Sequence, residues 1–520
     1  MATIIEILNE NAAEFCYKPV LFYKNNFLPY SDVLDASDRF AQGLKNLGIS
    51  PQHNVGILLP PIPEYFIAHY GCLKARCRIV PLSMQMRIND LKYLLEHLDL
   101  KALIFWDKFR EKLFKIIEQS AVRYSLIQVG DHCESGMYSF SEIIERSETI
   151  TIEDYPTESD EALILYSAGT TGHPKGAVFT HQALITAAKT MIDNFHINKC
   201  DKVICVLAVN HYLSQSFIIH AAFMMGSSLY LFPYFAPEEI AKTICEHSAN
   251  IFIGIQPMLN AFLKSPEIMP GQLSSLKYCL VTGSIIDEEI VKQFRNKFNI
   301  PITQSYGCVE TGTIVSAGEF MPGVEPRTVG KPFETVSIKI IDEYGNELLP
   351  GEIGEITIQS PMNKKKYYVL SEDLPEQIST AWEYPHDIGM LDKQRNLVYI
   401  GHKEEIINKG HYAIYPYEIE QCLLNHEAVA EAAVVGIPDE VFIEEVKAYI
   451  ILKPEITLTQ EEVIQYCRRF FPKYKCPRYV EFVETLPKNY SGSTIRRFLK
   501  KHTPVVVTEQ STESSQQLSS

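Results

Sequence analysis

Short apolar blocks alternate with stretches of helical periodicity along the middle of the chain. Mostly apolar runs predict buried strands at residues 203–208, 228–232, 251–254, 278–282 and 302–305. Apolar residues at helical spacing predict helices between them, at residues 237–248, 258–263 and 287–298. The same alternation crosses residues 54–106. Strands that alternate with helices predict an α/β fold of doubly wound, mostly parallel sheets with helices on both faces.

The pattern changes towards the carboxyl end. From Pro332 the predicted strands become shorter and are separated by turns, which indicates a β-rich subdomain. After Gly401 the pattern predicts a compact α+β unit with strands at residues 405–408, 432–435 and 448–452. One of its helices starts at Thr459, which forms a capping box with Glu462.

These changes predict how the chain is divided into domains. We expect a large N-terminal domain over residues 1–400, a hinge at residues 401–404 and a small, mobile α+β domain over residues 405–502. A chain of 520 residues exceeds what a single hydrophobic core usually supports, so more than one domain is expected. Residues 503–520 are polar and of low complexity, and we expect them to be disordered.

A loop rich in glycine and hydroxyl groups follows an apolar strand predicted at residues 162–166. Its backbone N–H groups, hydroxyls and ammonium group can surround an anion, and the residues that supply them are Ser167, Gly169, Thr170, Thr171, Gly172 and Lys175. The lysine stands between Pro174 and Gly176, so this is not the Walker pattern. The loop predicts a triphosphate site, and a solvated glycine-rich turn is the alternative.

Charge and cysteine usage exclude some classes of protein. The net charge of −16 argues against a nucleic-acid partner, because such surfaces are basic. The twelve cysteines include no Cys-x-x-Cys pair, which favours reduced, mostly buried thiols in a cytoplasmic protein. The most apolar stretch, residues 217–232, is interrupted by His220 and a Gly-Ser-Ser turn, so no transmembrane segment is expected.

A series of motifs that includes the glycine-rich loop spans most of the chain. They lie at residues 164–176, 304–311, 386–389, 401–405 and 487–493. The residues of these motifs and their order along the chain resemble those of the adenylate-forming superfamily, which includes acyl- and aryl-CoA synthetases, peptide-synthetase adenylation domains and beetle luciferase. The resemblance implies a ligase that uses ATP and Mg²⁺ to convert a carboxylic acid into acyl-AMP. It then transfers the acyl group to the thiol of CoA or of the phosphopantetheine of a carrier protein.

The resemblance also implies roles for residues in the larger domain. The loop, with Thr170 and Lys175, would hold the β- and γ-phosphates, and Glu310 would help to hold magnesium. Tyr306 would lie near the adenine, Asp387 would accept both ribose hydroxyls, and the adenine pocket would be completed by Gly307, Gly283 and Ser284. His211 would stand beside the acyl pocket, although a core histidine is an equal alternative.

Residues near the hinge carry the remaining implied roles. His402 would donate to the ribose where the family has arginine, and Glu404 would be the hinge residue. Gly410 would let the backbone lie close to a pantetheine arm, or it would simply form a hairpin turn.

Two further residues depart from the family pattern at functional positions. Val309 replaces a threonine that contacts the α-phosphate, and Ser493 replaces a lysine that bridges the acyl carboxylate and the α-phosphate. Loss of such a charge predicts slow adenylation. Three functions therefore stay open: a complete acid–thiol ligase, a partial enzyme that makes only the thioester from acyl-AMP, and a nucleotide-binding pseudoenzyme. The resemblance also disfavours an α-amino acid substrate. Amino-acid-adenylating relatives hold the α-ammonium group with an Asp just after the strand that corresponds to residues 203–208, and residues 209–214 contain no acid.

Overall fold

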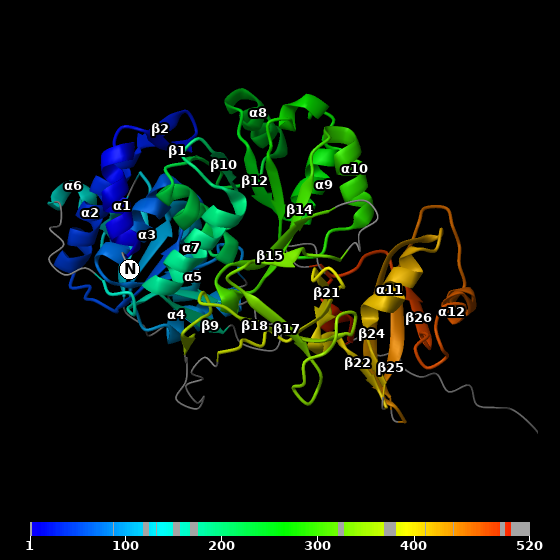
Figure 1. The fold of residues 1–520 in the computed structure, drawn as a ribbon. Coiled ribbons are helices and arrows are strands. Elements are labelled where there is room, and N and C mark those ends of the chain that lie inside the picture. Colours follow the sequence, from blue (N-terminus) through cyan, green and yellow to red (C-terminus); the bar gives the residue numbers. More distant parts are fainter. Residues whose placement is uncertain are drawn as a thin grey trace, which may run out of the picture. The chain divides into compact units, whose positions relative to one another are not determined.

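The chain folds into two compact units, Met1–Tyr399 and Ile400–Ser520 (Figure 1). The computed structural model describes residues 3–86, 88–117, 124–131, 133–148, 156–166, 175–320, 327–368, 381–410, 412–439, 441–488 and 494–500. The larger unit, coloured from blue to yellow in Figure 1, contains three sheets.

The first sheet of the larger unit is mostly parallel and is buried on both faces. Its strands, in spatial order, are β16 (Lys331–Pro332), β15 (Ile314–Glu319), β14 (Ile302–Gly307), β13 (Tyr278–Val281), β12 (Ile251–Gly254), β10 (Lys202–Cys205), β11 (Ser228–Leu231), β1 (Pro19–Tyr23) and β2 (Asn26–Pro29). Along β12, Ile251 and Ile253 enter one core cluster and Phe252 enters another. Because successive strand residues point to opposite faces, helices must cover both sides.

The helices around this sheet are α7 (His181–Phe195), the π-helical segment η2 (Ser214–Ala222), α8 (Pro237–His247), α9 (Gln256–Lys264) and α10 (Glu288–Phe298). Three of them, α8 to α10, lie where the alternation predicted them, whereas α7 and η2 were not predicted as helices by that alternation. Asp287 caps α10 by accepting a hydrogen bond from the Glu289 N–H. The strand predicted at residues 203–208 ends earlier, at Cys205, where the chain turns towards η2.

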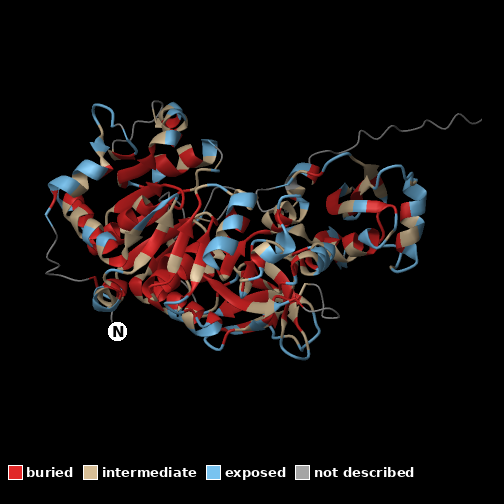
Figure 2. Cartoon of the chain, turned by 90° about the horizontal axis from the view of Figure 1, so that it is seen from above, coloured by how far each residue is buried: buried red, intermediate tan, exposed pale blue. Residues whose placement is uncertain are grey.

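The second sheet carries the apolar strand of the glycine-rich loop. Its order is β19 (Lys366–Tyr368), β9 (Gly176–Thr180), β8 (Glu161–Tyr166), β4 (Arg78–Pro81), β3 (Asn54–Leu58), β5 (Leu100–Trp106), β6 (Ser125–Val129) and β7 (Tyr138–Ser139). The remaining α-helices in the described part of the larger unit are α1 (Ile4–Phe15), α2 (Tyr30–Asn46), α3 (Pro63–Lys74), α4 (Ile88–His97), α5 (Arg110–Ile117) and α6 (Phe140–Arg146). Figure 2 shows the strands of the larger unit mostly buried and its helices exposed on their outer faces.

The third sheet is the predicted β-rich subdomain, and the smaller unit is the predicted α+β unit. The third sheet joins β17 (Ser337–Ile341), β18 (Gly354–Gln359), β20 (Asp387–Leu391) and β21 (Leu397–His402). The smaller unit contains β22 (Ile407–Lys409), β23 (Tyr412–Ile414), α11 (Pro416–Leu424), β24 (Val429–Asp439), β25 (Ile443–Leu452), α12 (Gln460–Arg468), β26 (Tyr479–Phe482) and α13 (Arg496–Lys500).

The predicted fold class is confirmed, and its errors are local. The capping box of Thr459 and Glu462 is present. The strand predicted from residue 405 begins at Ile407, because Glu405 belongs to the 3₁₀ turn η5 (Lys403–Glu405). All twelve cysteines are free thiols, of which seven are buried. Within the described ranges, no helix combines the length and apolarity that crossing a membrane requires.

Candidate functional site

Three parallel strands of the first sheet end at one edge, where several of the predicted site residues lie. His211 follows β10, Gly283 follows β13, and Tyr306 lies near the end of β14. Tyr212 ties these strand ends together, because its hydroxyl donates to the Gly307 carbonyl at 2.9 Å and lies 3.3 Å from the Thr282 hydroxyl. The carboxyl edge of a parallel sheet is where α/β proteins place ligands.

Tyr306 and Asp387 form a hydrogen bond between the first and third sheets. The buried Tyr306 hydroxyl donates to Asp387 Oδ2 at 2.7 Å, and the Tyr399 hydroxyl donates to Asp387 Oδ1 at 3.3 Å. Burial, and then the charge of Asp387, raise the pKa of Tyr306, so its hydroxyl stays a donor. These two hydrogen bonds orient the Asp387 carboxylate.

Glu310 lies three residues beyond the end of β14 and contacts the second sheet. It belongs to the short turn η4 (Val309–Thr311). The Tyr367 hydroxyl of β19 donates to Glu310 Oε1 at 2.8 Å, and the Lys175 ammonium lies 5.9 Å from the centre of the Tyr367 ring. The structure thus brings Lys175, Tyr367 and Glu310 together from three distant parts of the chain.

The glycine-rich loop connects two paired strands. β8 and β9 are antiparallel neighbours, with Tyr166 opposite Gly176. Lys175 is exposed and directly precedes β9. The other predicted phosphate-binding residues, Ser167, Gly169, Thr170, Thr171 and Gly172, lie outside the described residues.

The other predicted residues at this edge of the first sheet differ in hydrogen bonding, backbone conformation and burial. The half-buried ring of His211 accepts a hydrogen bond from the Leu213 N–H at 3.2 Å, and burial lowers its pKa to about 4, so the ring is neutral at pH 7. Gly283 has φ +86°, a conformation that glycine adopts without strain, and Ser284 beside it is half-buried. Val309 packs against the main core and offers no hydroxyl.

The predicted residues of the smaller unit contact nearby backbone. His402 accepts a hydrogen bond from the Glu404 N–H at 3.3 Å and thereby caps the turn η5. Gly410, with φ +64°, lies in the turn that joins the antiparallel strands β22 and β23, and its N–H donates to the Phe442 carbonyl at 2.7 Å. Gly410 thus lies in a hairpin turn, and its role towards a pantetheine arm stays a prediction. Ser493 lies outside the described residues.

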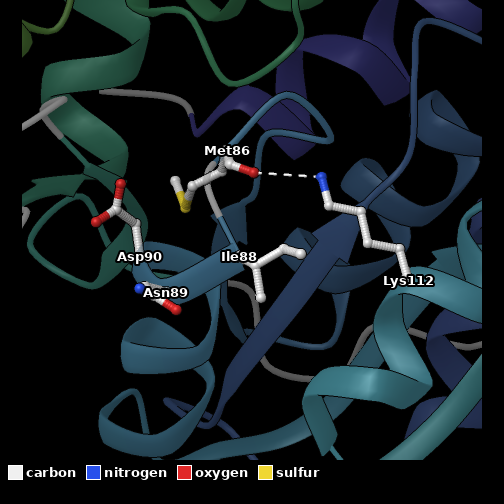
Figure 3. Close-up of a pocket in the computed structure, with 5 residues that line it drawn as sticks. All are labelled: Met86, Ile88, Asn89, Asp90 and Lys112. Carbon is white, nitrogen blue, oxygen red and sulfur yellow. Dashed lines mark hydrogen bonds between the residues drawn. The ribbon is translucent and has the colours of Figure 1, made fainter.

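An open pocket near α4 contains none of the predicted site residues. It is lined by Met86, Ile88, Asn89, Asp90 and Lys112 (Figure 3). The Lys112 ammonium donates to the Met86 carbonyl at 3.3 Å, so this side chain already holds the adjoining loop. In the described part of the chain, no group of three or more His, Cys, Asp or Glu side chains is arranged to hold a metal ion. A magnesium ion at Glu310 would therefore depend on the phosphates of a nucleotide for its other ligands, which is common for this ion.

Sequence reasoning missed three tyrosines of this region, Tyr212, Tyr367 and Tyr399. Each contacts a partner that is distant in sequence or on a neighbouring strand. The sequence offered one signal for Tyr212, which is that it directly follows the predicted His211. Nothing in the local sequence around Tyr367 or Tyr399 distinguishes them from other tyrosines in strands.

A carboxylate oriented at the edge of a parallel sheet, with a second carboxylate and a lysine nearby, is typical of α/β enzymes that bind nucleotides. Comparison with known families agrees with this class. Residues 8–368 match the sequence model of the AMP-binding enzyme family, and residues 418–493 match the model of the AMP-binding enzyme C-terminal domain. The chain belongs to the AMP-binding enzyme family, and the predicted membership of the adenylate-forming superfamily is confirmed.

Individual relatives agree over most of their length. A long-chain-fatty-acid–CoA ligase of Bacillus subtilis is 28% identical, with 96% of this chain and 94% of the relative covered. The mitochondrial acyl-coenzyme A synthetase ACSM3 of Mus musculus is 28% identical over 86% of this chain and 79% of its own. Among solved structures, o-succinylbenzoate CoA synthetase from Bacillus subtilis with its acyl-adenylate is 25% identical, with a TM-score of 0.81 over 96% of this chain and 98% of that one. The anthranilate CoA ligase AuaEII with anthranoyl-AMP shares the fold, with a TM-score of 0.84, 24% identity and 96% of each chain covered.

Proposed function

We propose that the protein is an ATP-dependent acid–thiol ligase that forms acyl-AMP from a carboxylic acid and then a thioester of CoA. The observation that carries the proposal is the segment from Tyr306 to Glu310. At one end Tyr306 bonds Asp387, and at the other Glu310 bonds Tyr367 beside Lys175. This short segment thus holds the Asp387 carboxylate, proposed for a ribose, at one end and carries the Glu310 carboxylate, with a cation nearby for phosphates, at the other.

The roles of individual residues follow from this arrangement. Asp387 would accept from both ribose hydroxyls, and Tyr306 would lie beside the adenine with Gly307, Gly283 and Ser284. Lys175 and the loop residues Ser167, Gly169, Thr170, Thr171 and Gly172 would hold the β- and γ-phosphates. The carboxylate of Glu310 fits magnesium, because among the described residues it receives a hydrogen bond only from Tyr367. Bound magnesium would neutralise charge that develops on the phosphate oxygens.

The acid and the thiol are defined less closely. Two relatives, a long-chain-fatty-acid–CoA ligase and an o-succinylbenzoate CoA synthetase, support a fatty or aryl acid. His211, neutral at pH 7, would stand beside the acyl group. In the smaller unit, His402 would donate to the ribose and Gly410 would lie along the pantetheine arm. CoA is the acceptor that the relatives support, and a phosphopantetheinylated carrier protein is the alternative.

A partial enzyme is the second candidate, and two residues favour it. Val309 cannot donate where the family pattern has threonine, and Ser493 cannot supply the lysine charge. Both losses affect the adenylation step. Such an enzyme would make the thioester from acyl-AMP that is supplied to it.

Two assays distinguish these functions. Pyrophosphate exchange with fatty and aryl acids measures adenylation, and CoA thioester formation from synthetic acyl-AMP measures the second step. Activity in both supports the complete ligase, activity in the second alone supports the partial enzyme, and activity in neither indicates a pseudoenzyme.

A matched pair of lysine variants tests the phosphate site by calorimetry. Lys175→Ala should weaken ATP binding by about tenfold, the size of a lost hydrogen bond to a charged group. Lys365→Ala removes the same charge from the neighbouring part of the sheet, where Lys365 lies 3.5 Å from Glu161, and should not change the affinity. Equal affinities in wild type and Lys175→Ala would contradict the assignment of the loop.

A further inference from the structure

Tyr367 lies between the two charged groups to which phosphate binding is assigned. Its hydroxyl donates to Glu310 Oε1 at 2.8 Å, and the Lys175 ammonium lies 5.9 Å from its ring centre. We propose that Tyr367 is a positioning residue that fixes the Glu310 carboxylate for magnesium and couples it to the strand after the phosphate loop. This inference rests on the function proposed above.

The backbone of β19 gives Tyr367 a fixed position. β19 pairs with β9 in antiparallel register, with Tyr367 opposite Ala177 and Tyr368 opposite Gly176. β9 begins immediately after Lys175, so the tyrosine and the lysine are held on neighbouring strands. A movement of the phosphate loop that shifts β9 would therefore be transmitted to Tyr367.

A second set of contacts joins the same segment to Glu310. The Lys364 N–H donates to the Glu310 carbonyl at 2.8 Å, and the Lys364 ammonium lies 4.4 Å from the Tyr367 ring centre. Lys364 is buried and forms an ion pair with the buried Glu383. Both the backbone and the side chain of Glu310 are thus held by residues 364–367.

The hydroxyl of Tyr367 has one specific consequence for a cation. It donates to Oε1 of Glu310 and so orients the carboxylate, and among the described residues Oε2 receives no hydrogen bond. Partners that orient a metal-binding carboxylate typically change metal affinity by about 10–100-fold when they are removed. Without the hydroxyl, the Glu310 side chain would have to be ordered during binding, and the affinity for magnesium would fall.

Tyr368 provides a matched control on the same strand. Successive residues of a strand point to opposite faces. The Tyr368 hydroxyl accordingly bonds Asn54 at 2.9 Å and the Leu98 carbonyl at 3.2 Å, away from Glu310. Tyr368→Phe removes the same atom one residue further along and tests for a general effect on the strand.

The test is calorimetric titration of the full chain with ATP at a series of magnesium concentrations and in EDTA. In Tyr367→Phe, the magnesium concentration that gives half of the increase in ATP affinity should rise by about tenfold. The affinity in EDTA should change by less than about twofold, because the hydroxyl contacts Glu310 and not the nucleotide. Tyr368→Phe should show the magnesium dependence of wild type.

A second variant, Glu310→Gln, tests the inference in a way that does not depend on correct folding of Tyr367→Phe alone. It should remove most of the magnesium dependence, and adding Tyr367→Phe to it should cause no further change. A wild-type magnesium dependence in Tyr367→Phe overturns the inference, and so does an additional loss in the double variant. Absence of magnesium-dependent ATP binding in wild type overturns the proposed function itself, which is a separate outcome.

Discussion

Two pairs of side chains at the candidate site of the larger unit bond each other across sheets, whereas the described candidate residues of the smaller unit bond nearby backbone. In the larger unit, Tyr306 bonds Asp387 and Tyr367 bonds Glu310 through side chains. In the smaller unit, the described hydrogen bonds of His402 and Gly410 are to backbone groups within the same unit. The larger unit therefore presents carboxylates that are oriented before a ligand binds, while the smaller unit presents a turn of defined shape.

This difference separates two kinds of experimental effect. Substitutions in the network of the larger unit should change nucleotide affinity, because they disturb preorganised acceptors. Substitutions in the smaller unit should change the rate of one reaction step and leave nucleotide affinity unchanged.

The largest effect is expected for Asp387→Ala. Two hydrogen bonds from ribose hydroxyls to a charged acceptor are each worth about 1.5–3 kcal/mol, so the Kd values of ATP and AMP should both rise by about 100-fold. Calorimetry with 2′-deoxy-ATP provides the control. Wild type should discriminate against the deoxy nucleotide and the variant should not. Equal discrimination by both proteins would show that Asp387 does not contact the ribose.

The next largest effect is expected for Ser493→Lys. A restored ammonium group at this position should raise pyrophosphate exchange by at least about tenfold, which requires about 1.4 kcal/mol of transition-state stabilisation. Thioester formation from supplied acyl-AMP should stay the same. Asn489→Lys adds the same charge earlier in the motif and should change neither rate. If wild type already adenylates at about one turnover per second, a typical enzyme rate, and Ser493→Lys has no effect, another cation replaces the missing lysine.

A smaller effect is expected for Gly410→Ala. At φ +64° a side chain costs about 1–2 kcal/mol. The nearest atom that the new Cβ would meet is 4.0 Å away, on Phe442, so strain and not collision should alter the turn. Thioester formation should fall by about fivefold, with ATP affinity unchanged.

Gly345→Ala is the control for this variant. Gly345 has φ +84° in an open turn of the larger unit, so the substitution introduces comparable strain away from the candidate site. It should leave the thioester rate unchanged. An equal loss in both variants would show that the effect of Gly410→Ala is a general loss of stability.

His220→Leu should not change turnover at pH 7. It tests whether His220 causes the loss of folding stability at acid pH. His220 is fully buried in η2, its ring centre is 5.0 Å from that of His69, and neither ring has a hydrogen-bond partner among the described residues. Burial lowers the pKa of His220 to about 3. Because the unfolded chain takes up a proton near pH 6.5 and the folded chain does not, stability should fall between pH 6.5 and 3, by about 1.4 kcal/mol per pH unit.

The variant should remove this part of the pH dependence. The free energy of unfolding, measured by denaturant titration from pH 7 to pH 4.5, should decrease less steeply in His220→Leu than in wild type. Parallel profiles would mean that another group carries the acid sensitivity.

The fold was predictable from the sequence where burial is continuous. β12 and β13 are apolar along their whole length, so their extents were predicted closely. β24 and β25 extend further than predicted, because their ends include exposed or charged residues such as Glu444 that hold their place through pairing. Periodicity detects burial and does not detect pairing between strands.

The candidate site was predictable only in part. The positions of Asp387 and Glu310 came from motifs, but their partners did not. Tyr306 is 81 residues from Asp387 and Tyr367 is 57 residues from Glu310, and no local pattern encodes contacts over such separations. The residues of the glycine-rich loop and Ser493 stay predictions, since they lie outside the described residues.

The segment from Tyr306 to Glu310 lies where the three sheets of the larger unit meet. β14 supplies it, Asp387 links it to the third sheet, and Tyr367 links it to the second. A nucleotide held there would oppose local opening of all three sheets at once. Amides of β9, β14 and β20 should then gain protection from hydrogen exchange together. A ligand at 100 times its Kd adds about 2.7 kcal/mol to stability, so occupancy would be visible as cooperative thermal stabilisation of the whole larger unit.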